Sequence, residues 1–484
     1  MILKFNHLQG KVAAGTAQDV VGTVYSLLEE GHINQDQFAR LQIELDWIQY
    51  KQNFREVVIA TQGYKHNSPA PIMDIHIDAR QVVPGCLRAE ILRAASRAWA
   101  NGESPAPADR VPLEDFQSLR TSVVWEFNKL YWNRLGDWES MSGASYEKAL
   151  PGGQSDGHLP EAIADSVMDF WNLLRDLEAR NQLPVEIFLL EIGVGTGTRM
   201  GLWLDKFREV DRERGTTYYP QLRVLLGDYA LGTLDRSRPA VAEHEDLCSF
   251  LVLDAQHPLK TLSFLRYKIM YVHSTNVYDN LPDEEVVRRD GRLYFVQVRA
   301  HLPMTEVVRI GQQFDVPPEK MRQHVDRLLE GHLNDFGPRS RGVEFWREVW
   351  KAVRLEERLV QLEDLPEFPF PEGLDAPRLE DMLADAPSDF RFHLSSGALE
   401  SFVRTLPLLH PRGFLQVQDI FVQNLDQYRV GFFGPGKLEG SLLNWVNGAI
   451  LKEVAERAGY NVHFAPFPYR KNSRTSILYT TRRE

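Results

Sequence analysis

Cysteine is scarce in this sequence, with only Cys86 and Cys248 among 484 residues. Two thiols are too few for a disulfide framework or a four-thiolate zinc site, and no His and Cys spacing typical of a zinc hydrolase is present. Long apolar runs are also lacking, since no stretch reaches the roughly 18 apolar residues that a bilayer-spanning helix needs. The first residues show no signal-peptide pattern. These absences predict a cytoplasmic protein with no metal site and no membrane partner.

An excess of basic residues is missing as well, because the formal net charge is −12. Proteins that hold nucleic acid through phosphate contacts usually carry a basic surface, so we expect no nucleic acid partner. The proportions of hydrophobic residues, 43%, and charged residues, 25%, are typical of a globular protein. The length is enough for about two or three domains. The oligomeric state is left open.

The first 180 residues are predicted to be mainly helical and to serve acceptor recognition or dimerisation. Asn34 is placed to cap a helix, because apolar residues follow it at helical spacing. These residues are Phe38, Leu41, Leu45 and Ile48. A Pro-rich break follows at 101–112, a second helix is expected to start at Pro112, and a third covers about 160–180. The segments VVIA and MDIHI are typical of short strands.

A different pattern begins at about residue 181, where short apolar runs alternate with longer segments that can hold helices. The runs are VEIFLLEIG, LRVLLGD, SFLVLDA and YKIMYVHS. Continuous apolar runs are typical of buried parallel strands, and this alternation predicts an α/β fold with a doubly wound sheet over 181–300. The same pattern resumes over 396–484, with a helix at about 396–409, a strand at 413–422, a helix at about 441–458 and two final strands.

Residues 301–395 interrupt the alternation. Helices are expected over 304–333 and 341–361, followed by an acidic, Pro-rich connector at 362–377. We therefore predict a helical insertion before the fifth strand, which could act as a lid over the acceptor.

The strongest motif follows the first of these strands and reads LEIGVGTGT. Glu191 ends the strand, and glycines then stand at every second position, which allows a sharp turn and close approach of the backbone to a ligand. A nicotinamide or flavin site needs a Gly or Ala six residues into this pattern, and Thr198 stands there instead. A carboxylate at the strand end suits the sulfonium and ammonium of S-adenosylmethionine better than a pyrophosphate. The predicted cofactor residues here are Glu191, Gly193, Gly195, Thr196 and Gly197.

Acidic residues also end the next two strands. Asp228, followed by Tyr229, is placed to accept the hydroxyls of a ribose, and Asp254, followed by Ala255 and Gln256, to accept an adenine amino group. Asn276, after the fourth strand, is assigned to the same cofactor site. Each acid alone could equally be a helix cap or a turn residue. The ordered series of polar strand ends favours a cofactor site.

Candidate catalytic residues stand around the end of the fourth strand, where the motif HSTNVYDNLP occurs. Asp279 and His273 could take or orient a proton from the acceptor, and Tyr278 could shape the pocket. Packing is the alternative reading for His273 and Tyr278. The candidate acceptor-binding residues lie in a Gly-rich loop and at the fifth strand end, and they are Tyr146, Ser155, His158 and Asp419. A plain surface connection is the alternative reading for the loop.

These motifs resemble the class I, Rossmann-like superfamily of S-adenosylmethionine-dependent methyltransferases over about 185–300 and 396–480. The resemblance implies a seven-stranded sheet with a closing antiparallel hairpin. A narrower likeness is to the protein arginine methyltransferases that assist assembly of mitochondrial complex I, and their bacterial relatives. That family carries an Asn-Glu-x-x-Asp-Ala-x-Pro motif after the fourth strand. The corresponding segment here contains Asn276, Asp279, Leu281 and Pro282, but Val277 stands in place of the family's Glu.

The function predicted from the sequence is transfer of a methyl group from S-adenosylmethionine to an N or O acceptor, either a protein side chain or a small molecule. The main alternative is a methyltransferase fold retained as a non-catalytic assembly or binding protein. The other alternative is a nicotinamide-dependent oxidoreductase. Thr198 argues against it, because it stands where that pattern needs Gly or Ala.

Overall fold

The structure is a computed structural model of the chain. It describes residues 1–5, 14–46, 54, 58–64, 71–78, 84–99, 110–289, 292–362, 368, 370–384, 386, 390–430 and 434–483. Most of the predicted Pro-rich break at 101–112 and part of the connector at 362–377 lie outside these residues. Among the described helices, none combines the length and the apolar character needed to cross a membrane.

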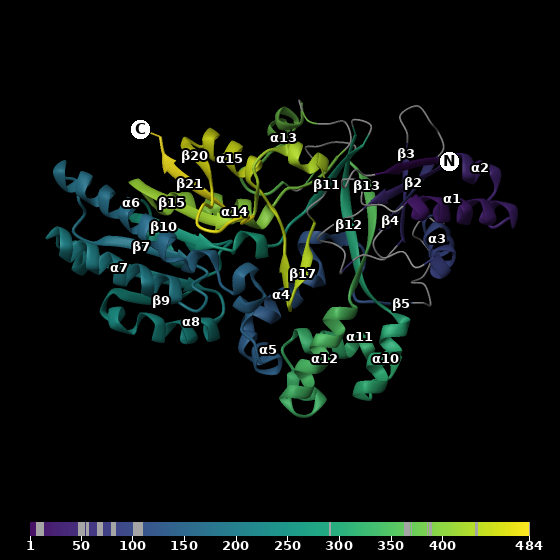
Figure 1. The fold of residues 1–484 in the computed structure, drawn as a ribbon, viewed down its shortest axis with the longest axis horizontal. Coiled ribbons are helices and arrows are strands. Elements are labelled where there is room, and N and C mark those ends of the chain that lie inside the picture. The colour runs from purple at the N-terminus through teal and green to yellow at the C-terminus, as the bar shows by residue number, and fades with distance from the viewer. Residues whose placement is uncertain are drawn as a thin grey trace.

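A large seven-stranded sheet forms one end of the molecule (Figure 1). Its strand order is β20-β21-β15-β10-β7-β8-β9. The strands are β7 (Ile187–Ile192), β8 (Leu222–Asp228), β9 (Cys248–Val252), β10 (Ile269–Thr275), β15 (Leu409–Asp419), β20 (Tyr460–Pro466) and β21 (Ser476–Arg482). The five strands from β9 to β15 are parallel, and β21 is antiparallel to both of its neighbours. The predicted α/β fold with a large central sheet is confirmed.

Helices cover both faces of this sheet, which explains why its inner strands are apolar on both sides. On one face α6 (Pro160–Ala179) and α7 (Thr198–Arg214) pack through Phe170 and Trp203 against Leu189 of β7. On the other face α14 (Ser396–Thr405) and α15 (Gly448–Arg457) pack through residues such as Leu399 against Leu190. The helix predicted over about 441–458 begins later than predicted, at Gly448. The residues before it form the short strands β18 (Ser441–Leu443) and β19 (Val446–Asn447).

A second sheet occupies the middle of the molecule (Figure 1). It consists of β13 (Arg354–Gln361), β12 (Arg292–Pro303), β11 (Glu285–Arg289) and β14 (Phe390–His393), with β5 (Arg110–Pro112) and β6 (Gln117–Ser118) added along β12. The helices α10 (Met304–Phe314), α11 (Met321–Leu329) and α12 (Arg339–Ala352) pack on it. The segment 301–395, predicted to be a helical insertion, contains these helices but also the strands β13 and β14.

The sheet-forming segment RLEERLVQ illustrates the cause of this difference. Its Leu and Glu residues favour a helix in isolation, and the sequence predicts a helix to residue 361. In the structure α12 ends at Ala352, and the segment pairs with β12 along its whole length. Pairing with a partner strand and packing in a core override weak local preference.

The amino-terminal part is also less helical than predicted. It contains a four-stranded sheet in the order β1-β2-β4-β3, with β1 (Ile2–Phe5), β2 (Leu41–Asp46), β3 (Val58–Tyr64) and β4 (Pro71–Asp78). Two long helices, α1 (Ala14–Glu29) and α3 (Pro84–Trp99), accompany it. The predicted segments VVIA and MDIHI overlap β3 and β4. This sheet lies at the opposite end of the molecule from the seven-stranded sheet (Figure 1).

The predicted helix after Asn34 is only partly present. Asn34 caps α2 (Gln35–Ala39) in a capping box with Gln37, as its position predicts. The helix then stops, because Leu41, Ile43 and Leu45 alternate along β2 and are buried in the sheet core. Ile48 lies outside the described residues. Similarly, Pro112 ends β5, and the next long helix, α4 (Val123–Asn133), begins later, followed by α5 (Leu135–Ser142).

Candidate active site

The turn after β7 contains three glycines with left-handed backbone conformation. The φ angle is 76° at Gly193, 55° at Gly195 and 75° at Gly197. The turn is tied to the next strand because the N–H of Gly193 donates to the carbonyl of Gly227 at 2.8 Å. A Cβ at Gly193 would lie 2.3 Å from Cγ2 of Val277, whereas a Cβ at Gly195 would have no neighbour within 4 Å. Gly195 is therefore the open point of the turn, where a ligand can approach the backbone.

Glu191, two residues before the first glycine of this turn, is a buried carboxylate with one unpaired oxygen. Its Oε1 lies 3.5 Å from Nη1 of Arg199, and its Oε2 has no hydrogen-bond partner among the described residues. Burial raises the pKa of Glu191, and the Arg199 guanidinium opposes that rise. Because a buried unsatisfied acceptor is costly, Oε2 is suited to receive an N–H group from a ligand.

Arg199, which the sequence analysis missed, also joins a buried polar network. Its Nη2 donates to the hydroxyl of Tyr271 at 2.8 Å, and that hydroxyl donates to Oε1 of Gln416 at 2.7 Å. His273 completes the network, with Nδ1 3.0 Å from Gln416 Oε1 and Nε2 2.7 Å from Thr275 Oγ1. Burial, together with the Arg199 charge, lowers the pKa of His273 well below its usual range. The structure thus places His273 in the core with both ring nitrogens engaged, which corrects its prediction as a catalytic residue.

Asp228 ends β8 with its carboxyl group turned toward the glycine turn. Its Oδ1 accepts the N–H of Ala230 at 3.0 Å, and the backbone of Gly195 lies near this carboxyl group and lowers its pKa. Burial raises the pKa of Asp228 to about 6. Tyr229 follows at the same edge and is partly exposed. The predicted ribose-binding acid and the predicted cofactor turn are therefore direct neighbours.

The residues predicted to bind adenine lie just beyond β9. Asp254 accepts the N–H of Gln256 at 2.9 Å through Oδ1, and its Oδ2 lies 2.8 Å from Nδ1 of His257. Ala255 is partly buried. The side chain of Gln256 lies against the start of α14, where a Cβ at Gly397 would be 3.1 Å from Nε2. In the structure these contacts shape a turn at the same sheet edge as Asp228.

A tight turn after β10 meets the glycine turn directly. Asn276 has a φ of 51°, a left-handed conformation that Asn tolerates, and its N–H donates to the carbonyl of Gln418 at 3.0 Å. Its carbonyl accepts a hydrogen bond from Nδ2 of Asn280 at 3.3 Å. Val277, the next residue, is the side chain that a Cβ at Gly193 would strike. The structure therefore brings Asn276 and the predicted cofactor turn together.

Asp279 and Asp419 form a buried carboxyl pair at the ends of β10 and β15. Oδ2 of Asp419 accepts the N–H groups of Tyr278 at 3.0 Å and of Asp279 at 3.3 Å. Oδ1 of Asp279 accepts Nδ2 of Asn280 at 2.8 Å. Burial raises the pKa of Asp419 to about 7, and burial together with the Asp419 charge raises the pKa of Asp279 well above its usual range. Asp419, which was predicted to bind the acceptor, holds the turn that carries Asp279.

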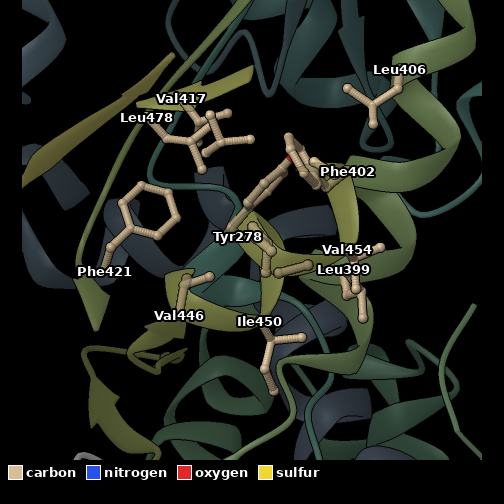
Figure 2. Close-up of a cluster of buried hydrophobic side chains, with 14 of the residues drawn as sticks. Tyr278, Leu399, Phe402, Leu406, Val417, Phe421, Val446, Ile450, Val454 and Leu478 are labelled. Atoms are coloured by element: carbon tan, nitrogen blue, oxygen red, sulfur yellow. The ribbon is translucent and has the colours of Figure 1, made fainter. Parts of the chain in front are cut away.

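Tyr278 points away from this edge into the hydrophobic core. Its side chain is 2% exposed, and its ring lies among Leu399, Phe402 and Val417 (Figure 2). Its hydroxyl group lies beside that of Ser401 on α14. Tyr278 therefore packs α14 against the sheet, which corrects the prediction that it shapes the reacting centre.

Tyr146 is brought next to the carboxyl pair, although it is 133 residues before Asp279 in the sequence. It lies in the short helix η3 (Tyr146–Ala149), and its hydroxyl lies near the side chain of Ser441. Burial, followed by the negative charge of Asp279, raises the pKa of Tyr146 well above its usual range, and the Asp419 charge adds to this rise. Tyr146, Asp279 and Asp419, which were predicted from separate parts of the sequence, therefore lie near one another in the structure.

Side chains from α4 complete the surroundings of Asp279. The indole of Trp132 meets the Tyr146 ring edge-on, with centroids 4.9 Å apart, and its Nε1 donates to Oδ1 of Asn280 at 3.2 Å. Nδ2 of Asn128 donates to the carbonyl of Asn280 at 3.1 Å. Nothing in the local sequence marks Trp132 or Asn128, because α4 reaches the site only through folding.

The loop that holds Ser155 and His158 contacts the glycine turn through Glu147. Oε1 of Glu147 accepts the hydroxyl of Thr196 at 3.3 Å and lies 3.8 Å from Nδ1 of His158. Burial lowers the pKa of His158. Ser155 contributes a local turn, because its carbonyl accepts the N–H of His158 at 3.2 Å. His158 is therefore near the predicted cofactor turn, and the contact between Glu147 and Thr196 was not predicted.

The same loop is anchored to the carboxyl-terminal hairpin. Asp156 accepts the hydroxyls of Ser473 at 2.8 Å and Thr475 at 2.7 Å, and its Oδ1 lies 3.0 Å from Nε of Arg470. These contacts fix the loop over the carboxyl edge of the sheet, beside the glycine turn.

Comparisons with known proteins give weak likenesses. No protein-family model and no curated protein matches the chain. A Burkholderia thailandensis protein whose crystal structure holds bound S-adenosylhomocysteine is similar over 80% of this chain and 90% of its own, with 12% identity and a TM-score of 0.43. The CcbJ methyltransferase of Streptomyces caelestis is similar over 66% of this chain and 90% of its own, with 12% identity and a TM-score of 0.30. Since both scores lie below 0.5, function has to be argued from the site itself.

Proposed function

We propose that this chain transfers a methyl group from S-adenosylmethionine to a nitrogen or oxygen acceptor. The observation that carries the proposal is the unpaired Oε2 of the buried Glu191, two residues before a glycine turn that is open at Gly195. The arrangement of five parallel strands and an antiparallel hairpin supports it, because this is the sheet that the class I methyltransferase resemblance implies.

The residues present fit this cofactor. Glu191 Oε2 would accept the cofactor's amino group, the turn at Gly195 would let the backbone approach it, and Asp228 would accept the ribose hydroxyls. The turn at Asp254 would border the adenine. The cofactor would supply a methyl group activated by its sulfonium charge, and the chain supplies position and electrostatics.

A dinucleotide fits less well. A pyrophosphate would lie on the glycine turn near the buried carboxylate of Glu191, and the two negative charges would repel in a poorly solvated place. The side chain that could offset the charge, Arg199, is already engaged with Glu191 and Tyr271.

Asp279 is the group that we assign to the acceptor's proton. It lies in the turn that touches Gly193, and its negative charge helps to raise the pKa of the Tyr146 hydroxyl. A carboxylate whose pKa is raised by burial is a better proton acceptor near neutral pH than an exposed one. The edge-on rings of Tyr146 and Trp132 lie near Asp279 and can orient an acceptor.

The proposal is tested by calorimetric titration of the purified chain with S-adenosylhomocysteine. A Gly195→Arg variant would fill the open point of the turn, and we expect it to lose binding by at least about 100-fold, as for a blocked pocket. Gly215→Arg is the matched control. Gly215 also has a positive φ, 68°, and open space around its Cβ, but it lies at the far end of α7.

Three outcomes are informative. Binding that is lost in Gly195→Arg and kept in Gly215→Arg supports the cofactor site. Absence of binding to the folded wild-type chain refutes the proposed function. Binding without methyl transfer to any protein or small-molecule acceptor tested would favour the non-catalytic assembly or binding role.

A further inference from the structure

The carboxyl pair Asp279 and Asp419 has no positive partner in the part of the chain that the structure describes. Both side chains are buried, with 2% and 0% exposure. Among the described residues, no Lys, Arg or His forms an ion pair with either carboxyl group. The contacts of Asp419 are backbone N–H groups, and that of Asp279 is the amide of Asn280. These neutral donors stabilise a single negative charge far better than two.

Two buried carboxylates without a cation carry a large desolvation cost, and each destabilises the other. The charge of the pair acts on two tyrosine hydroxyls, that of Tyr146 from η3 and that of Tyr278 from η9 (Tyr278–Asn280), whose side chain points into the hydrophobic core. Burial raises the pKa of both hydroxyls. The hydroxyl of Tyr131 on α4 also acts on Tyr146, and because it is neutral it supplies no positive charge. We therefore expect the two carboxyl groups to titrate as a coupled pair whose second ionisation is disfavoured, so that the pair retains a proton in the free protein.

The turn that carries Asp279 also contacts the glycine turn. Asp419 holds the N–H groups of Tyr278 and Asp279, and Val277, in the same turn, packs on Gly193. A positive charge that binds at the glycine turn would therefore lie beside the turn that carries Asp279. In a poorly solvated site such a charge favours the fully ionised pair.

We propose that Asp279 and Asp419 exchange their proton for the positive charge of the cofactor. The pair releases the proton when S-adenosylmethionine binds and regains one from the acceptor during transfer. The inference rests on the proposed function. In the balanced step, the acceptor's lone pair forms the new bond to the methyl carbon, sulfur keeps the electrons of the broken bond, and the acceptor's proton moves to the Asp279 carboxylate. The pair thus carries one proton again when the sulfur is neutral.

This proton exchange can be measured without knowing the acceptor. S-adenosylmethionine and S-adenosylhomocysteine share every ionisable group and differ in the sulfonium charge. Each is titrated into the chain at pH 7 in two buffers of different ionisation enthalpy, which gives the number of protons released on binding. We expect S-adenosylmethionine to release more protons, with the difference approaching one per site. Below the apparent pKa of the pair, the ratio of the two affinities should rise about tenfold for each pH unit.

The variants Asp279→Asn and Asp419→Asn separate the pair from other ionisable groups. Each leaves a single carboxyl group beside an uncharged amide, so the difference in proton release should fall toward zero and the affinity ratio should lose its pH dependence. Asp211→Asn is the matched control, because Asp211 is also a buried carboxyl group that accepts backbone N–H groups, at the far end of α7. Near-UV circular dichroism shows whether each variant folds. If one of the two variants does not fold, proton release by the other variant tests the inference.

Equal proton release for both ligands in the wild-type chain would overturn the inference while leaving the cofactor site intact. A difference that persists in both pair variants would overturn it as well. If neither ligand binds the folded wild-type chain, it is the proposed function that fails.

Discussion

The carboxyl group of Asp419 accepts the backbone N–H of Asp279 at 3.3 Å, which joins the ends of β10 and β15 across 140 residues of sequence. The same oxygen accepts the N–H of Tyr278 at 3.0 Å, and the other oxygen accepts the N–H of Ile420 at 2.8 Å. One buried side chain therefore determines the conformation of the turn that carries the proposed proton acceptor. Loss of this carboxyl group should affect both stability and the orientation of Asp279.

Replacement of Asp419 by Ala should destabilise the chain more than replacement by Asn. Ala leaves the N–H groups of Tyr278 and Ile420 buried without an acceptor, at a cost of about 1–3 kcal/mol each. Asn retains one acceptor oxygen and should cost about half as much. Urea unfolding of the wild-type chain and the two variants at pH 7 measures this order. Equal stability of Asp419→Ala and the wild type would show that the turn is held by other contacts.

The packing of the two central turns predicts a specific pair of substitutions. In Gly193→Ala the new methyl group would overlap Cγ2 of Val277 and the residue would keep a left-handed φ, so we expect a loss of about 2–4 kcal/mol. In Gly195→Ala only the backbone strain applies, about 1–2 kcal/mol. The double variant Gly193→Ala, Val277→Ala should recover part of the loss. Thermal unfolding of the four chains measures these differences, and no recovery in the double variant would contradict the packing argument.

Replacement of Arg199 alone should destabilise the chain more than replacement of Glu191 and Arg199 together. Arg199→Met leaves a buried carboxylate without its partner, which costs about 3–5 kcal/mol. The double variant Glu191→Gln, Arg199→Met removes both charges and should be less destabilised than Arg199→Met alone. A double-mutant cycle in urea measures the coupling. Additive effects of the two replacements would mean that the charges do not interact.

The affinity for S-adenosylhomocysteine should depend on the ionisation of Asp228, whose pKa is raised to about 6 by burial. The ionised carboxylate is the acceptor for ribose hydroxyls, so binding should be strongest above pH 7 and fall roughly tenfold by pH 5. The free energy of unfolding should depend on pH in the opposite direction. A raised pKa favours the folded chain below pH 4, and this contribution is lost as the pH rises through about 6.

Asp228→Asn separates these two effects. Binding should be weaker at pH 7 and nearly independent of pH between 5 and 7, because the amide does not titrate. The unfolding free energy of the variant relative to the wild type should rise over the same interval. Calorimetry and urea unfolding at both pH values give the two quantities. A variant with the same pH profile of binding as the wild type would assign the titration to another group.

The glycine turn and its flanking acids could be predicted because their signals are local. Four apolar runs, each ending in a polar residue, identify β7, β8, β9 and β10, and the carboxyl ends of parallel strands meet at one edge. Glu191 and Asp228 were therefore placed near the predicted cofactor turn, and the structure has them there. The direction of individual side chains was harder to predict. His273 faces the core of the sheet and Tyr278 faces α14, because their orientation depends on which neighbour covers each face.

By itself the sequence determined the buried parallel strands, the sharp glycine turn and the capped start of α2, since each depends on residues a few positions apart. Only the tertiary structure decided that RLEERLVQ is a strand and that Asp279, Asp419 and Tyr146 share one site. These outcomes depend on contacts between residues more than 50 positions apart, whose free energy is gained only when the chain has folded. A local pattern reports the preference of a segment, and the energy of its partner decides whether that preference is realised.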